Sequence, residues 1–271
     1  MRLRSLAATA TAAIVAVTLA GCYVPPTPDE IEALHASFVA SQSATPSITA
    51  EGPIVTYSPD PVEEETHLSY IATANESAID VYTEPNGDVQ QTIAAADVLT
   101  VPDSTPLTFL VETRATGWYQ VYLPVRPNGT TGWVRADDVS VTTTNYWVEV
   151  DITHFTLTAY LGTVQVFQTA IGVGRDDRPT PGGVYYIREL LQVPDPQSIY
   201  GPYAYGLSGF QPVLDEFNGG EAIIGMHGTN DPSSIGKYVS SGCIRMPNDA
   251  ITELATEVGL PLGTPVYIDQ L

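Results

Sequence analysis

Apolar and polar residues alternate in short runs along most of the chain, a pattern that favours strands over long helices. One such run spans residues 118–123, and two pairs, Asn86-Gly87 and Asn128-Gly129, supply turn residues typical of β-hairpins. Further strand-like runs occur at residues 146–151, 156–160, 164–167, 184–187 and 265–268. The pattern therefore predicts a mainly β protein.

Two segments place their apolar residues at helical spacing instead. The first, residues 28–41, begins within Thr27-Pro28-Asp29-Glu30, a capping-box pattern with proline at the first helical position. The second has Asn248 or Asp249 as its candidate N-cap and Gly259 as its stop, with apolar residues at Ile251, Leu254, Ala255 and Val258. We expect one helix in each of these segments.

The N-terminal residues have the layout of a secretory signal. Two arginines precede an Ala/Val/Leu-rich stretch, and the apolar run over residues 6–20 is short for a membrane-spanning helix. Leu19-Ala20-Gly21-Cys22 resembles the lipobox of bacterial lipoproteins, in which the cysteine is lipidated and becomes the first mature residue. We expect residues 1–21 to be a lipoprotein signal peptide and Cys22 to be lipidated. An ordinary signal with an incidental Cys22 is the alternative.

Charge and cysteine content narrow the function classes. The 271 residues carry 10 Lys plus Arg against 31 Asp plus Glu, a formal net charge of −21, which argues against a nucleic-acid partner. Two cysteines are too few for a disulfide scaffold or a four-cysteine zinc site. An anionic lipid surface repels such a chain, so a lipid on Cys22 offers a physical means of holding it there.

The chain divides into segments of different character. Residues 22–65 combine the predicted helix with a spacer, residues 43–65, that is rich in Ser, Thr, Pro and acidic residues. Residues 66–143 read as short strands and turns, and "GWYQVYLPVRPNGTTGWVRADDV" resembles the last strands and closing turn of a bacterial SH3-like barrel. In that family the module often binds cell-wall material or packs on an enzyme domain, and both roles stay open.

One constellation in the C-terminal half carries candidate chemistry. His227 and Gly228 precede the segment Ser240-Ser241-Gly242-Cys243-Ile244-Arg245, and the cysteine comes 16 positions after the histidine. A histidine near a thiol can generate the nucleophilic thiolate. Glycine beside the sulfur leaves room for a carbonyl, whose developing oxyanion the N–H groups of Gly242 and Cys243 can stabilise. A buried, inert cysteine is the alternative.

This constellation, "HGT…SSGCIRM", resembles the active-site signature of the L,D-transpeptidase (YkuD-like) family. The segments "WVEVDITHFTLTAYLGTVQVFQTAIGVG", "RPTPGGVYYI", "GPYAYGL" and "GTPVYI" also resemble that family, so the likeness extends over about 125 residues. Together with the SH3-like resemblance of residues 66–143, it implies an SH3-like barrel followed, over residues 144–271, by a β-sandwich-type catalytic domain with one C-terminal helix.

The resemblance also implies roles for individual residues. Cys243 is the expected nucleophile, His227 its base, and the carbonyl of Gly228 the group that orients the imidazole. Gly242 and Cys243 are the expected oxyanion-hole donors. No metal or other cofactor is required, because covalent catalysis divides the reaction into two steps.

Four further residues are candidates for substrate contact. Arg245 binds a substrate carboxylate or braces the loop, and bracing is the favoured interpretation; Ser240 shapes the loop. Ser241 departs from the family pattern, in which many relatives have histidine, so any supporting role of that second histidine is in doubt. Tyr203, with Tyr200 and Tyr205, forms a lid or simply packs.

The expected function is that of a peptidoglycan L,D-transpeptidase, anchored by lipid outside the cytoplasm and facing the cell wall. It forms 3→3 cross-links between stem peptides through a cysteine thioester. Hydrolysis at the same site, an L,D-carboxypeptidase activity, is one alternative. A non-catalytic wall-binding lipoprotein is another. An NlpC-type endopeptidase is a further enzyme reading. That family places its cysteine before its histidine, whereas no histidine follows Cys243, so the order of the residues argues against it.

Overall fold

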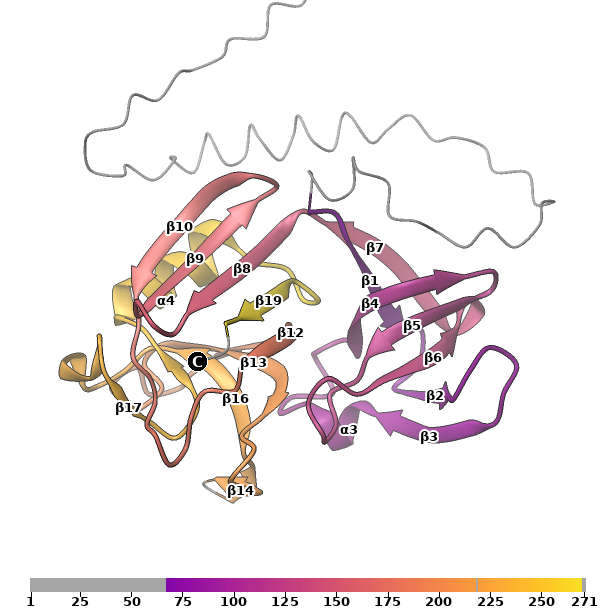
Figure 1. Cartoon of the computed structure of the whole chain (residues 1–271), viewed down its shortest axis with the longest axis horizontal. Coiled ribbons are helices and arrows are strands. Elements are labelled where there is room, and N and C mark those ends of the chain that lie inside the picture. The colour runs from indigo at the N-terminus through magenta and orange to yellow at the C-terminus, as the bar shows by residue number, and fades with distance from the viewer. Residues whose placement is uncertain (1–66, 218, 270–271) are drawn as a thin grey trace, which may run out of the picture.

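The computed structural model describes residues 67–217 and 219–269. Strands are the main secondary structure of these residues (Figure 1). This confirms the mainly β class. The predicted signal peptide, Cys22, the helix over residues 28–41 and the spacer lie outside the described residues. Within the described ranges, no helix is both long and apolar enough to cross a membrane.

Residues 69–144 form a seven-stranded sheet in the order β3-β2-β6-β5-β4-β1-β7. Both Asn-Gly pairs lie in hairpin connections, Asn86 between β2 and β3 and Asn128 between β5 and β6, as predicted. The strands are β1 (Ser69–Ala74), β2 (Ala78–Tyr82), β3 (Val89–Ala94), β4 (Thr108–Ala115), β5 (Trp118–Tyr122), β6 (Thr131–Arg135) and β7 (Val139–Thr144), with a one-turn helix α3 (Ala95–Val98) and a 3-10 turn η1 (Ala136–Asp138). We call this the N-terminal unit; its SH3-like identity stays a prediction.

A second sheet, of eight strands, begins after Asn145 and has the order β10-β9-β8-β19-β12-β13-β16-β18. Its strands are β8 (Tyr146–Asp151), β9 (Thr156–Leu161), β10 (Val164–Ala170), β12 (Gly183–Gln192), β13 (Tyr203–Phe210), β16 (Ile223–His227), β18 (Ile244–Arg245) and β19 (Pro265–Ile268). Two smaller ladders pair β11 (Val173–Gly174) with β17 (Tyr238–Ser240), and β14 (Glu216–Phe217) with β15 (Gly220–Glu221). A 3-10 turn, η2 (Pro232–Ser234), precedes β17. We call residues 146–269 the C-terminal unit.

The predicted C-terminal helix is present but begins differently. It comprises α4 (Asn248–Glu253) continued by a π-helical turn η3 (Leu254–Val258), and Gly259 ends it with φ 65°. Neither Asn248 nor Asp249 is the N-cap, because Pro247 occupies that position. The Asn248 side chain is used elsewhere, since its Oδ1 accepts the Thr229 N–H at 2.8 Å. The sequence pattern missed this because the two residues lie 19 positions apart.

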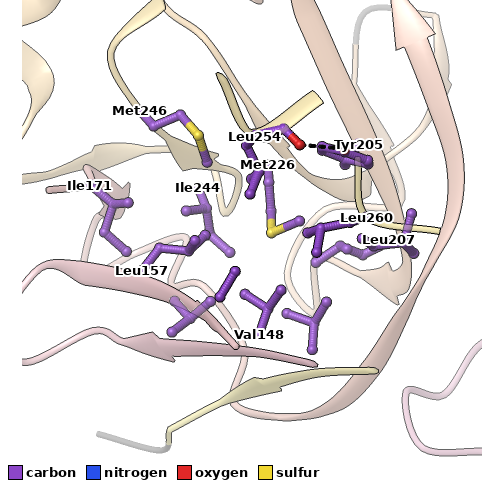
Figure 2. Packing of buried hydrophobic residues seen from close by; sticks show 14 of the residues in the cluster. Val148, Leu157, Ile171, Tyr205, Leu207, Met226, Ile244, Met246, Leu254 and Leu260 are labelled. Atoms are coloured by element: carbon purple, nitrogen blue, oxygen red, sulfur yellow. Dashed lines mark hydrogen bonds between the residues drawn. The ribbon is translucent and has the colours of Figure 1, made fainter. Parts of the chain in front are cut away.

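Alternation along β16 and β18 determines what these strands present to the core. Met226 and Ile244 are fully buried in the hydrophobic cluster of the C-terminal unit (Figure 2). Tyr205 lies in the same cluster and donates its hydroxyl to the Leu254 carbonyl at 3.2 Å. Because successive side chains of a strand point to opposite faces, His227 and Arg245, which follow Met226 and Ile244, are directed away from this core. Cys243, which immediately precedes β18, lines the same pocket as they do.

The two units share a packed interface. Tyr186 of β12 is fully buried and belongs to the hydrophobic cluster of the N-terminal unit. Glu189 of the same strand, only 2% exposed, accepts the backbone N–H and the hydroxyl of Thr100, each at 2.9 Å. Gly263, whose N–H donates to the Ile187 carbonyl of β12 at 2.7 Å, lies against Ile71, whose Cγ2 would be 2.5 Å from an added Cβ. The units therefore fold against one another, with β12 at the boundary.

Replacing Gly263 with alanine tests this interface. Gly263 and Gly259 both have positive φ, 85° and 65°, but a Cβ on Gly259 meets nothing within 4 Å. We expect Gly259→Ala to cost about 1 kcal/mol of unfolding free energy from backbone strain alone. Gly263→Ala should lose about 1–3 kcal/mol more, because Ile71 must move. Urea denaturation of the two variants measures the difference, and equal losses would contradict the contact.

Candidate active site

Parallel pairing of β16 with β18 brings the two sequence motifs together. The register sets Met226 beside Ile244 and His227 beside Arg245, so residues far apart in sequence become neighbours. The side chains that point away from the core open onto one pocket, which we call the Cys243 pocket. It is lined by Ile199, Tyr200, Phe217, Ala222, Ile223, His227, Ser240, Ser241, Cys243 and Arg245. The structure thus places the predicted nucleophile and its base in one pocket.

His227 is buried, with 4% of its surface exposed, and held by its neighbours. Its Nδ1 lies 2.6 Å from the Gly228 carbonyl, which can only accept, so this nitrogen carries the proton. The remaining nitrogen, Nε2, is then a lone-pair acceptor. The Tyr200 ring packs edge-on against the imidazole, with ring centroids 5.0 Å apart.

The environment of His227 favours the neutral ring. Burial lowers the pKa of His227 to about 4; the hydrogen bond to Gly228 opposes this shift, and the positive charge of Arg245 adds to it. At neutral pH the imidazole is therefore uncharged, with its one proton on Nδ1. A neutral ring with Nε2 free is the form that can accept a proton.

Cys243 is half-buried at the end of the turn that leads into β18. Burial raises the pKa of its thiol, while the Gly225 backbone and the positive charge of Arg245 lower it in part. The Sγ lies 3.8 Å from the Ile223 carbonyl, a weak contact in which the thiol is the donor. The resting sulfur is therefore a thiol that needs a base to become nucleophilic.

Residues 240–243, which we call the Cys243 turn, are tied together by one hydroxyl. Ser240 Oγ donates to the Cys243 carbonyl at 2.6 Å and accepts the Gly242 N–H at 3.1 Å. Gly242 has φ 113°, a conformation that disfavours any side chain. Thr180 Oγ1 donates to the Gly242 carbonyl at 2.8 Å from outside the turn. These bonds agree with the predicted loop-shaping role of Ser240.

The two predicted oxyanion donors differ in availability. The Gly242 N–H is already used by Ser240 Oγ. Within residues 67–217 and 219–269, the structure records no hydrogen-bond partner for the Cys243 N–H. Cys243 is therefore the better candidate donor, and a role for Gly242 requires its bond to Ser240 to be shared or released.

Not all of the candidate substrate-contact residues reach the pocket. Arg245 and Ser241 line the pocket, and Arg178 Nη1 lies 3.4 Å from Ser241 Oγ. The Nε of Arg245 is buried without a hydrogen-bond partner among the described residues, so this nitrogen gives no support to the favoured bracing role. Tyr203 does not line the pocket; it packs against the core, and Tyr200 takes the place at the pocket wall.

Several residues that build the site had no signal in the sequence. Thr180 donates to Gly242 of the Cys243 turn from 62 positions away. Gln211 donates to the carbonyl of Pro179, the residue before Thr180, and Asn248 holds the loop after His227. Ile199 and Phe217 form apolar parts of the pocket wall. The "RPTPGG" turn contained Thr180, but its bond to Gly242 depends on the tertiary fold.

Comparison with known proteins agrees with this geometry. Residues 145–268 match the family model described as the YkuD L,D-transpeptidase catalytic domain. The protein YkuD of Bacillus subtilis is 38% identical over 125 residues, which are 46% of this chain and 66% of YkuD. YkuD of Bacillus licheniformis is 38% identical over 123 residues, which are 45% of this chain and 65% of that protein. The match thus spans just under two thirds of either relative.

Among solved structures, Bd1075 of Bdellovibrio bacteriovorus is 26% identical, with 46% of this chain and 48% of that chain covered and a TM-score of 0.37. The residues matched by the family model include the strands and loops that carry His227 and Cys243. Residues 145–268 of this chain are therefore similar to the YkuD L,D-transpeptidase catalytic domain.

Proposed function

We propose that this protein is a peptidoglycan L,D-transpeptidase that works through a Cys243 thioester. One observation carries the proposal: a neutral histidine with Nε2 free and a protonated thiol face the same pocket, within a domain similar to those of this family. A wall-binding protein without catalysis has no need for this pair. The proposal concerns the whole chain, of which the matched domain is the C-terminal part.

The first half-reaction follows from the two protonation states. His227 Nε2 takes the proton from Cys243 Sγ while the sulfur attacks the carbonyl carbon of the third residue of a donor stem peptide. The Cys243 N–H stabilises the oxygen on which charge develops. The bond to the terminal D-Ala then breaks, the imidazolium returns its proton to the departing amine, and a thioester remains. Gly228 stabilises the imidazolium, since its carbonyl accepts the Nδ1–H.

The second half-reaction regenerates the thiol. The side-chain amine of an acceptor stem attacks the thioester carbonyl and loses a proton to His227, and the sulfur leaves as the new amide forms. The released thiolate recovers the proton from the imidazolium, so charge and protons balance over the cycle. The product is the 3→3 cross-link. Water in place of the amine gives a shortened stem and makes the same site a carboxypeptidase.

Charge supports a substrate that carries carboxylates. The chain has only 10 basic residues, yet Arg245 lines the pocket and Arg178 borders it through Ser241. Arginine pairs well with carboxylates, which stem peptides present at their termini and on their acidic residues. Ile199 and Phe217 supply apolar parts of the pocket wall. We therefore assign Arg245 to substrate carboxylate binding.

We also propose that this activity is held outside the cytoplasm by lipid on Cys22. Support comes from the signal-like residues 1–21 and from the lipobox-like Leu19-Ala20-Gly21-Cys22. With its large negative charge, the chain gains no electrostatic attraction to anionic lipid. Acyl chains would supply the missing affinity.

Intact-mass spectrometry after exposure to a carbapenem tests the nucleophile. The full chain should gain the mass of one carbapenem, and Cys243→Ala should gain none, because the acyl group resides on that sulfur. Cys22→Ala is the matched control, since it removes the other cysteine and should keep the adduct. The absence of an adduct on the parent chain, or its persistence in Cys243→Ala, would overturn the assignment.

Muropeptide analysis with the purified chain separates transfer from hydrolysis. Incubation with disaccharide-tetrapeptide should yield 3→3 linked dimers and free D-Ala, because the thioester reacts with the acceptor amine. Tripeptide monomers without dimers would instead identify a carboxypeptidase. Cys243→Ala should give neither product.

The pH dependence of carbapenem acylation tests the resting protonation states. Since the pKa of His227 is lowered to about 4, the ring stays neutral as the pH falls from 8 to 6, and the acylation rate should stay level. The rate should fall only near pH 4, where the base becomes protonated. In Arg245→Gln this acid limb should move to higher pH, because the Arg245 charge helps to lower the pKa of His227. An acid limb near pH 6.5 in the parent chain would contradict a buried, neutral base.

A further inference from the structure

The loop between β5 and β6, residues 123–130, reaches from the N-terminal unit onto the C-terminal unit. Arg126 donates from Nη1 to the Gln211 carbonyl at 2.9 Å and from Nη2 to the Leu214 carbonyl at 2.7 Å. Asn128 donates from Nδ2 to the Phe210 carbonyl at 2.7 Å and accepts the Phe210 N–H at Oδ1 at 2.8 Å. Four hydrogen bonds therefore hold residues 210–214. We call residues 123–130 the Arg126 loop.

These bonds fix the backbone more firmly than packing alone. Two of them carry the charge of the guanidinium, and charge-assisted bonds are shorter and stronger than neutral ones. The Asn128 amide binds both polar atoms of one backbone residue, as a neighbouring strand would. The Arg126 side chain also lies over the Phe210 ring, with Cζ 5.0 Å from the centroid.

The segment held in this way supports the Cys243 turn. Gln211 is 1% exposed, and its Nε2 donates to the Pro179 carbonyl at 3.0 Å. Its Cγ lies so close to Gly242 that a Cβ added there would be 2.9 Å away. The Gln211 N–H also donates at 2.8 Å to the carbonyl of Ala222, a residue of the pocket wall. Gln211 thus lies between the Arg126 loop and the pocket.

A second connection runs through the turn that contains Thr180. Asn128 Nδ2 lies 3.4 Å from the Tyr185 hydroxyl, which donates to the Gly182 carbonyl at 3.1 Å. The same turn presents Thr180 Oγ1 to the Gly242 carbonyl. Both connections end at Gly242, the residue before Cys243. Thr180 binds its carbonyl, and Gln211 packs against its Cα.

We propose that Arg126 and Asn128 are positioning residues for Cys243, so that the N-terminal unit completes the active site through Gln211 and Thr180. Neither residue lines the Cys243 pocket, and each acts by holding the backbone beside the Cys243 turn. The acylation readout rests on the proposed function. The chemistry needs the Cys243 N–H and Sγ aligned with one carbonyl, and displacing them by a fraction of an ångström slows that step.

Substitution of Arg126 in the full chain tests this, with Cys22→Ala as the background so that Cys243 is the remaining thiol. Arg126→Met keeps the stem over Phe210 and removes both bonds. Arg126→Lys keeps the charge and can reach one carbonyl. Thr100→Val is the matched control, because it removes an interface bond that ends on Glu189 and not on residues 210–214.

At saturating carbapenem, Arg126→Met should lower the first-order acylation rate about 10–100-fold, with little change in the half-saturating concentration. Arg126→Lys should recover part of the rate. The acylation rate of Thr100→Val should stay within about twofold of the parent rate, because the bond that it loses does not hold residues 210–214. Equal rates in Arg126→Met and the parent, or equal losses in Arg126→Met and Thr100→Val at matched melting temperatures, would overturn the proposal.

Alkylation by iodoacetamide separates this proposal from the proposed function. It reports the Cys243 thiol whether or not the chain reacts with carbapenem. Release of the Cys243 turn should expose the half-buried sulfur, so alkylation should be several-fold faster in Arg126→Met and unchanged in Thr100→Val. If the parent forms no carbapenem adduct, the transpeptidase assignment fails and this comparison still decides the positioning role: unchanged alkylation in Arg126→Met would refute it.

Discussion

The active site depends on the alternation of side chains along two short strands. Met226 and Ile244 are fully buried, and the parallel register pairs them. That burial removes any freedom to slip by one residue, since a slip would exchange core and pocket faces over both strands. His227 and Cys243 therefore meet at the pocket because their neighbours in sequence meet in the core.

Burial also determines the electrostatics of the pair. A histidine and a thiol removed from water both favour their neutral forms, so the resting site holds no buried ion pair whose desolvation must be compensated. Arg245 acts oppositely on the two groups, because its charge disfavours the imidazolium and favours the thiolate. Charge separates only during proton transfer, when the Gly228 carbonyl stabilises the imidazolium. The site is thus arranged for general-base activation of the sulfur.

Local pattern was sufficient to predict some features, and tertiary contacts were needed for others. The strand over residues 146–151 has the predicted bounds, and Gly259 ends the helix, because alternation and left-handed glycine act within a few residues. The His227 and Cys243 pair was predicted from their motif. The placement of Tyr200 rather than Tyr203 at the pocket was not, because they lie three positions apart on a bend whose direction depends on packing. The roles of Asn248 and Gln211 rest on bonds between distant segments.

The Cys243 turn shows why the two units belong together. A turn with a glycine at φ 113° has weak intrinsic order, since glycine loses more conformational freedom on folding than other residues. Ser240 restrains it from within, but one hydroxyl cannot fix both its shape and its place relative to His227. Placement needs contacts from elements that do not move with the turn. Thr180 and Gln211 supply these contacts, and the Arg126 loop holds the segments that carry them. Precision at the sulfur is therefore a property of the interface between the units as much as of the sheet that contains Cys243.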